Sequence, residues 1–146
     1  LPDCCEKLHT AASGSKSAFA HSVIQQFGDS DHKMATSEFS PADWIPGNTI
    51  DAMALISKEV WSFVGGFATH RMGWQDYDFW CRVVDAGLPW EYVPEILCEY
   101  RVHGSSMLRT STDGTKNKAE LVDEMEKNFA WVSPIDSRKG HRVPQE

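Results

Sequence analysis

A helical pattern that leads directly into a strand pattern constrains this chain most. Residues 75–86 repeat apolar side chains at intervals of three, four and seven positions, which predicts a helix. Apolar residues cover much of its circumference, so we expect the helix to be deeply packed. After Gly87, residues 90–103 show an extended pattern. Pro94 leaves two alternatives open there, two short strands or one bent edge strand.

Other segments repeat this alternation of helix and strand. A polar stretch, residues 28–49, interrupts the order and predicts a long loop. The alternation favours an α/β fold, with one domain over residues 1–133 and a tail over residues 134–146. The remaining elements are predicted as a helix over 4–12, a strand over 17–27, a strand over 51–57, a helix over 58–64 capped by Ser57, and a helix over 117–132.

Charge and composition exclude several classes of protein. The 146 residues carry a net charge of −7, which argues against a nucleic-acid partner and against an electrostatic membrane anchor. The sequence contains no apolar run long enough for a transmembrane segment and no signal-peptide pattern, so a cytoplasmic location is expected. The four cysteines lack zinc-ligand spacing, and a structural disulfide framework is not expected.

An acid, Asp76, stands at the head of the helix predicted over residues 75–86. The simpler interpretation is a first-turn acid that satisfies the helix N-terminus. A second interpretation follows from its place on the apolar side of the helix after a glycine-rich, aromatic loop. A carboxylate held at such a rim is suited to act as a general base toward a hydroxyl.

Polar residues gather where the strand over residues 90–103 ends. Arg101 and His103 are predicted to fall on one side of that strand together with Leu97 and Glu99. Ends of strands in α/β sheets often carry ligand sites, and arginine binds phosphate or carboxylate in bidentate fashion. An ion pair for Arg101 and an ordinary surface role for His103 remain the alternatives, as does simple packing for Trp74.

Two segments carry a resemblance to a known family. NTIDAMALISKEVWSFVGGF is followed by GWQDYDFWCRVVDAGLPWEYVPEILCEYRVHGSSM. This order resembles the second, acceptor-side half of family 2 glycosyltransferases with the GT-A fold, over roughly residues 17–110. The resemblance implies a partial GT-A fold with a mixed sheet flanked by helices.

The resemblance also implies a reaction and a set of site residues. Such enzymes transfer a sugar from a nucleotide-diphosphate donor to an acceptor hydroxyl, usually with inversion. Asp76 matches the general base, and His103 matches a ligand of a divalent metal, Mn²⁺ or Mg²⁺, that binds the diphosphate. By the same resemblance, the substrate-binding residues are Gly66, Trp74, Gln75 and Arg101.

The sequence departs from the family pattern in two ways, and these departures suggest an alternative function. Gln75 stands where the family often has Glu, and the nucleotide-binding half with its DxD motif is missing. Neither Asp29-Ser30-Asp31 nor Asp76-Tyr77-Asp78 follows an apolar strand, so neither is taken as that motif. We therefore expect a fragment that is inactive alone, from a longer protein that is cytoplasmic or lies at the inner face of a membrane. The alternative is a non-catalytic binding or assembly module, a half-domain that is expected to self-associate through its exposed surface.

Overall fold

Strand β1 (Phe19–Gly28) is the centre of the sheet, because three other strands pair with it. The computed structural model describes residues 1–36, 38, 50–69, 73–106, 110, 115–129, 135–136 and 141–142. Strand β4 (Trp90–Val102) runs parallel to β1 along its whole length. The short strands β2 (Lys33–Met34) and β3 (Leu55–Ile56) pair antiparallel with β1, so they share its other edge.

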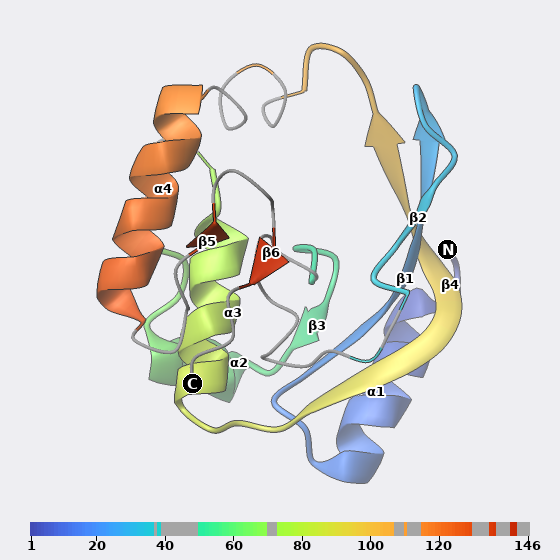
Figure 1. Ribbon diagram of the computed structural model, residues 1–146. Coiled ribbons are helices and arrows are strands. Elements are labelled where there is room, and N and C mark those ends of the chain that lie inside the picture. Colours follow the sequence, from blue (N-terminus) through green and yellow to red (C-terminus); the bar gives the residue numbers. More distant parts are fainter. Residues whose placement is uncertain are drawn as a thin grey trace.

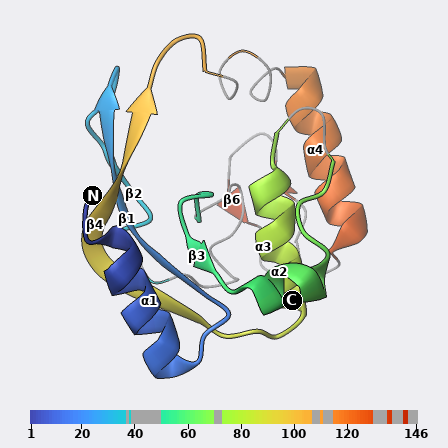
Figure 2. The same cartoon turned by 180° about the vertical axis from the view of Figure 1, so that it is seen from behind.

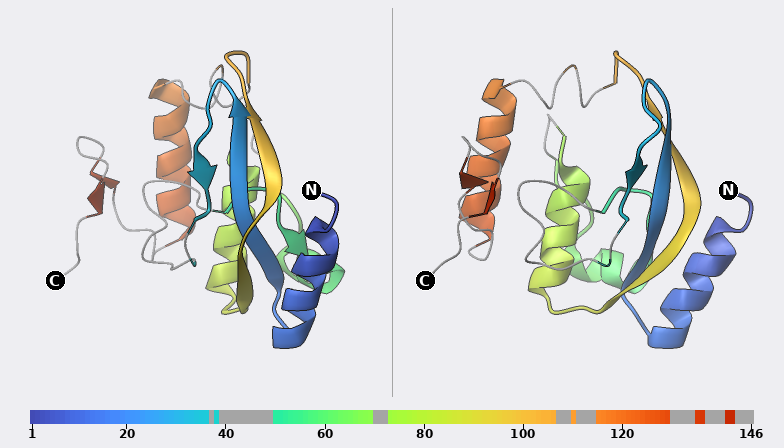
Figure 3. Two further views of the ribbon diagram at one scale, coloured as in Figure 1. Left: turned by 90° about the vertical axis from the view of Figure 1, so that its right-hand side faces the viewer. Right: turned by 45° about the vertical axis from the view of Figure 1, so that its right-hand side comes forward.

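Helices cover both faces of this sheet. Helix α1 (Cys4–Ser15) packs on one face, and helix α3 (Gln75–Asp85) faces the other (Figures 1 and 3). Helix α4 (Thr115–Asn128) lies beyond α3, on the side away from the sheet. Among the described residues the fold thus has four helices, with α2 (Lys58–Val64), and a four-stranded sheet. This confirms the prediction of an α/β fold and of a sheet flanked by helices.

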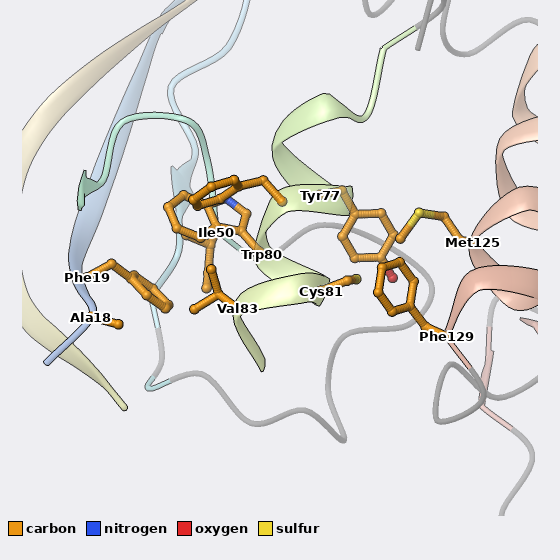
Figure 4. Packing of buried hydrophobic residues seen from close by; sticks show 10 residues of the cluster. Ala18, Phe19, Ile50, Tyr77, Trp80, Cys81, Val83, Met125 and Phe129 are labelled. Carbon is orange, nitrogen blue, oxygen red and sulfur yellow. The ribbon is translucent and has the colours of Figure 1, made fainter. Parts of the chain in front are cut away.

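Two hydrophobic cores follow from this layering. The α3-side core lies between β1, α3 and α4, and Figure 4 shows α3 with its side chains directed to both neighbours. Trp80 and Val83 point toward Phe19 of β1, whereas Tyr77 and Cys81 point toward α4. The α1-side core fills the opposite face of the sheet and contains Leu8, Ala20, Ile24, Val93, Leu97 and Cys98.

Helix α1 is longer than the sequence pattern indicates. We predict an end at the Ser13-Gly14-Ser15 segment, but the helix continues through Ser15. The Ser15 hydroxyl donates to the Ala11 carbonyl at 3.0 Å, so this serine is satisfied within the helix instead of breaking it. Lys16 then ends the helix with a left-handed backbone, φ 56°. Asp3 precedes the helix, but its side chain makes no capping hydrogen bond.

The helix over residues 58–64 is confirmed with the same bounds, and the helix over 75–86 is confirmed with a small change at its end. Ser57 accepts a hydrogen bond from the backbone N–H of Val60, as expected of an N-cap. Gly65 ends α2 with φ 84°, a conformation that glycine adopts without steric cost. Helix α3 ends one residue early, at Asp85.

Strand β4 is one continuous strand with an irregularity beside Pro94, which settles the alternatives left open by the sequence. The pairing with β1 shifts register between Ser22 and Val23 and again between Val23 and Ile24. As a result Leu97 and Cys98, which are neighbours in sequence, both enter the α1-side core. The predicted alternation, with Leu97 on the side of Glu99, is therefore wrong, because a bulge changes the face of a strand.

Other segments agree with the sequence patterns less completely. Strand 17–27 is confirmed as β1, but only Leu55–Ile56 of the strand over 51–57 forms. The last helix forms as α4, over Thr115–Asn128 instead of 117–132, with Leu121 and Met125 buried and Phe129 buried just after it. The loop over 28–49 contains β2, and most of the remainder lies outside the described residues. In the tail, β5 (Ile135–Asp136) pairs with β6 (His141–Arg142).

None of the helices within the described ranges combines the length and the apolar character that crossing a bilayer requires.

Candidate functional site

The polar residues at the end of β4 lie on the face of the sheet opposite α1. Ile24 and Cys98 are register partners and both belong to the α1-side core. The next partners, Gln25 and Glu99, must then point to the other face, because successive side chains alternate. Arg101 points to this face as well and is exposed.

The first turn of α3 and these strand residues belong to the upper ends of two elements that run in opposite directions. Helix α3 runs against the direction of β4, so in Figures 1 and 2 its N-terminus is the upper end of the helix, near mid-height of the fold, and the C-terminal end of β4 lies above it on the other side. Trp74, Gln75 and Asp76 thus lie at the upper end of α3, whereas Arg101 and His103 lie at or just after the upper end of β4. We name this set of five residues the candidate site.

Asp76 is half-buried in the first turn of α3. Its Oδ1 accepts a hydrogen bond from the backbone N–H of Tyr77 at 2.9 Å. This contact satisfies a helix N-terminal donor, as the simpler interpretation of Asp76 expects. The aligned peptide dipoles of the helix also favour the ionised carboxylate at this position. The general-base role requires that same ionised form, so both interpretations are compatible with this geometry.

Trp74 begins α3 in an unusual backbone conformation. Its φ of 64° is left-handed, which costs a residue with a Cβ roughly 1–2 kcal/mol. The carbonyl of Trp74 accepts from the N–H of Asp78 at 2.9 Å, and its indole packs edge-to-face on Tyr77 at 5.4 Å. Trp74 thus packs against the α3-side core. Strained backbone of this kind clusters at ligand sites and persists only where packing enforces it.

Gly66 lies elsewhere, in the connection between α2 and α3. Its carbonyl accepts from Nη2 of Arg82 at 2.7 Å, and Arg82 stands six positions beyond Asp76, or about 9 Å along the helix axis. Gly66 has φ 72°, and a Cβ added there would approach the ring of Trp61 to 3.0 Å. The structure therefore places Gly66 in a closely packed connection between two helices and does not bring it to the candidate site.

His103 follows β4 directly and is half-buried. Its Nδ1 lies 3.1 Å from the Ser105 hydroxyl. Among the described residues, no group of three or more His, Cys, Asp or Glu side chains is placed to hold a metal ion. The described part of the chain does not fit a metal centre at His103 by itself, so no chemical step is assigned to a metal here.

Sequence patterns did not single out His21, a buried polar residue of β1. Only 3% of its surface is exposed, and neither ring nitrogen has a hydrogen-bond partner among the described residues. The ring lies between Phe19 and Tyr92, with centroid separations of 6.3 and 5.1 Å. Burial lowers the pKa of His21 to about 4. The sequence signal that could have drawn attention to His21 is a histidine within a strand of alternating apolar residues.

Comparisons with protein-family models, curated proteins and solved structures give no match for this chain. The resemblance to family 2 glycosyltransferases therefore rests on the sequence motifs themselves.

Proposed function

We propose that the chain is the acceptor-side half of a glycosyltransferase domain and that Asp76 acts as its general base. One observation carries the proposal: α3 and β4 run in opposite directions, so the first turn of α3, with Asp76, and the end of β4, with Arg101, are the upper ends of both elements in Figure 1, and His103 follows β4 directly. These are the positions that the motif resemblance assigns to acceptor activation and to the donor diphosphate.

The transfer reaction requires a carboxylate held in a fixed position and a cation near the departing diphosphate. Asp76 takes the proton of the acceptor hydroxyl while the acceptor oxygen bonds to the anomeric carbon of the donor sugar. The bond from that carbon to the diphosphate oxygen breaks, and the nucleoside diphosphate leaves with the electron pair. Attack from the side opposite the leaving group inverts the anomeric configuration. Arg101 supplies positive charge for the departing diphosphate.

Helix α3 is well anchored for such a task. Tyr77, Asp78, Phe79 and Trp80 follow Asp76 directly and are all buried. A base must be held within a narrow range of distance and angle from its substrate, and a helix fixed by packing achieves this better than a loop. The arrangement gives a physical reason for an acid at the head of a core helix.

The substitution Asp76→Asn tests this role. Sugar transfer from nucleotide-diphosphate donors would be measured in the protein that carries this sequence. Because the amide cannot accept the proton, we expect kcat to fall about 10²–10⁴-fold, with the melting temperature little changed. The matched control is Asp85→Asn, which makes the same change on an exposed residue at the other end of α3. Turnover in Asp76→Asn equal to that of Asp85→Asn would remove Asp76 from the mechanism.

A second candidate, a non-catalytic assembly module, is favoured by exposed aromatic side chains on and just after α2. The exposed fractions are 39% for Trp61, 71% for Phe63 and 44% for Phe67. Exposed apolar groups gathered in one region indicate a surface that another chain covers. Absence of transfer activity together with concentration-dependent association would favour this module over the enzyme.

A further inference from the structure

Two thiols from distant parts of the sequence are in contact in the α1-side core. Sγ of Cys4, in the first turn of α1, lies 3.4 Å from Sγ of Cys98 in β4. Cys98 is buried and Cys4 is half-buried, and both are reduced. These two residues stand 94 positions apart in the chain, so the fold, not local sequence, brings them together.

Further contacts hold the same helix end against the same strand. The backbone nitrogen of Leu1 donates to the carbonyl of Leu97 at 2.9 Å. One turn into α1, Lys7 forms an ion pair with Glu95. The thiols thus lie between two other contacts that join α1 to β4, and their approach is set by how these elements pack.

We propose that Cys4 and Cys98 are a disulfide-forming pair, which a low-molecular-weight disulfide such as oxidised glutathione converts into a covalent link between α1 and β4. A disulfide has a sulfur–sulfur bond of about 2.05 Å, so the two atoms must approach by about 1.4 Å. Rotation about the Cα–Cβ bonds moves each sulfur, and Cys4 is the more accessible of the two thiols because it is only half-buried.

The reaction proceeds by two exchanges. The Cys4 thiol loses its proton to solvent, and the thiolate attacks one sulfur of oxidised glutathione, releasing one glutathione thiolate. The Cys98 thiol then loses its proton and attacks Sγ of Cys4, releasing the second glutathione. Two protein thiols are oxidised to one disulfide, and one glutathione disulfide is reduced to two thiols. Burial and the neighbouring Cys98 raise the pKa of Cys4 to about 11, so the first exchange accelerates as the pH rises.

The other cysteines are placed differently. Cys5 is exposed, and as the next residue of the helix it points about 100° away from Cys4. Cys81 is buried in the α3-side core, on the other side of the sheet. Since Cys98 faces α1 and the candidate site lies on the opposite face, the inference does not depend on the proposed function.

The experiment oxidises the full chain with glutathione disulfide in mildly alkaline buffer, alkylates the remaining thiols, and maps trypsin peptides by mass spectrometry without reductant. We expect residues 1–7 joined to residues 83–101, with Cys81 alkylated. The melting temperature should rise by about 10 °C or more, because the link closes a long loop, and should return to its starting value when reductant is added.

Cys4→Ser and Cys5→Ser are the matched variants, because they change adjacent residues of one peptide in the same way. The link and the rise in melting temperature should be lost in Cys4→Ser and kept in Cys5→Ser. The proposal is overturned by a link that persists in Cys4→Ser, by a bond between Cys4 and Cys5, by glutathione adducts alone, or by four free thiols.

Discussion

His21 lies in the middle of β1 with neither ring nitrogen hydrogen-bonded to any described residue. A buried polar group of this kind lowers the stability of the fold, because it loses its hydrogen bonds to water and forms none with the described residues. The neutral imidazole can be tolerated between Phe19 and Tyr92, but the protonated ring cannot be solvated there. This accounts for the lowered pKa of His21, about 4 against an ordinary 6.5.

The lowered pKa predicts acid sensitivity of the fold. Above pH 6.5, His21 is neutral in both folded and unfolded chains, and its contribution does not change with pH. Between pH 6.5 and about 4 the unfolded chain binds a proton that the folded chain does not, so the free energy of unfolding falls as pH falls. The full loss is about 3 kcal/mol. Urea titrations between pH 7 and pH 4 measure it.

The control for this prediction separates His21 from the carboxylates that titrate in the same range. In His21→Leu the pH dependence should be weaker by the His21 contribution, whereas His9→Gln, at an exposed position, should keep the wild-type slope. Equal slopes in His21→Leu and the wild type would show that His21 is not the group responsible.

Among the elements, α2 and α3 are joined by one arginine. Arg82 donates from Nε and Nη2 to Oδ2 of Asp78, at 2.9 and 2.6 Å, and from its two terminal nitrogens to the carbonyls of Gly66 and Val64. Asp78 is buried. The guanidinium thus forms an ion pair with the buried carboxylate of Asp78 and donates hydrogen bonds to carbonyls at the end of α2.

Replacing this arginine should destabilise the fold strongly. In Arg82→Met the buried carboxylate of Asp78 loses the guanidinium of Arg82, so we expect a loss of about 3–5 kcal/mol in the free energy of unfolding. The control is Lys127→Met, which breaks an exposed pair with Asp123 at the same four-residue spacing and should change stability little. Denaturant unfolding of both variants decides the matter; similar losses would contradict the structural role of Arg82.

Elements with strong local patterns were predictable, and those that depend on pairing were not. The helix over 75–86 was predicted closely because its apolar spacing and the pair Asp78–Arg82 are local signals. The short β3 was not, since only Leu55 and Ile56 find a partner in β1. The bulge beside Pro94 also depends on the partner strand, so the face taken by Leu97 could not be read from alternation.

The candidate site was predictable to a similar degree. Helical spacing puts Asp76 in a first turn, and strand length puts His103 at a strand end. Only the register of β4 with β1 shows that Arg101 lies on the face away from α1. The left-handed backbone of Trp74 has no sequence signal, because tertiary packing imposes it. Gly66 was assigned by resemblance, and its contact with Arg82 comes from the fold alone.

At the scale of the whole molecule, the layers leave the region around α2 open. The sheet is covered by α1 on one face and by α3 on the other, with α4 outside α3. Phe63 on α2 remains 71% exposed. The fold therefore presents an aromatic surface that none of its described elements covers.

This surface predicts self-association. Sedimentation velocity at increasing concentration should show species larger than a monomer, and Phe63→Ser should reduce them because it removes the most exposed aromatic ring. Phe27→Ser, at another exposed phenylalanine on β1, is the matched control and should leave association unchanged. A single monomer peak at all concentrations would contradict the prediction.

The central place of β1 has a consequence for how the chain is made. Phe19 of β1 pairs with Trp90, and Gly28 pairs with Val102, so the longest pairing in the sheet waits for residues synthesised much later. During translation β1 leaves the ribosome before any of its partner strands, and its edge toward β4 stays bare longest. The ordering cost of closing so long a loop must be met before β1 and β4 pair. A nascent chain interrupted before Trp90 would lack this pairing and would present an open strand to chaperones or to other copies.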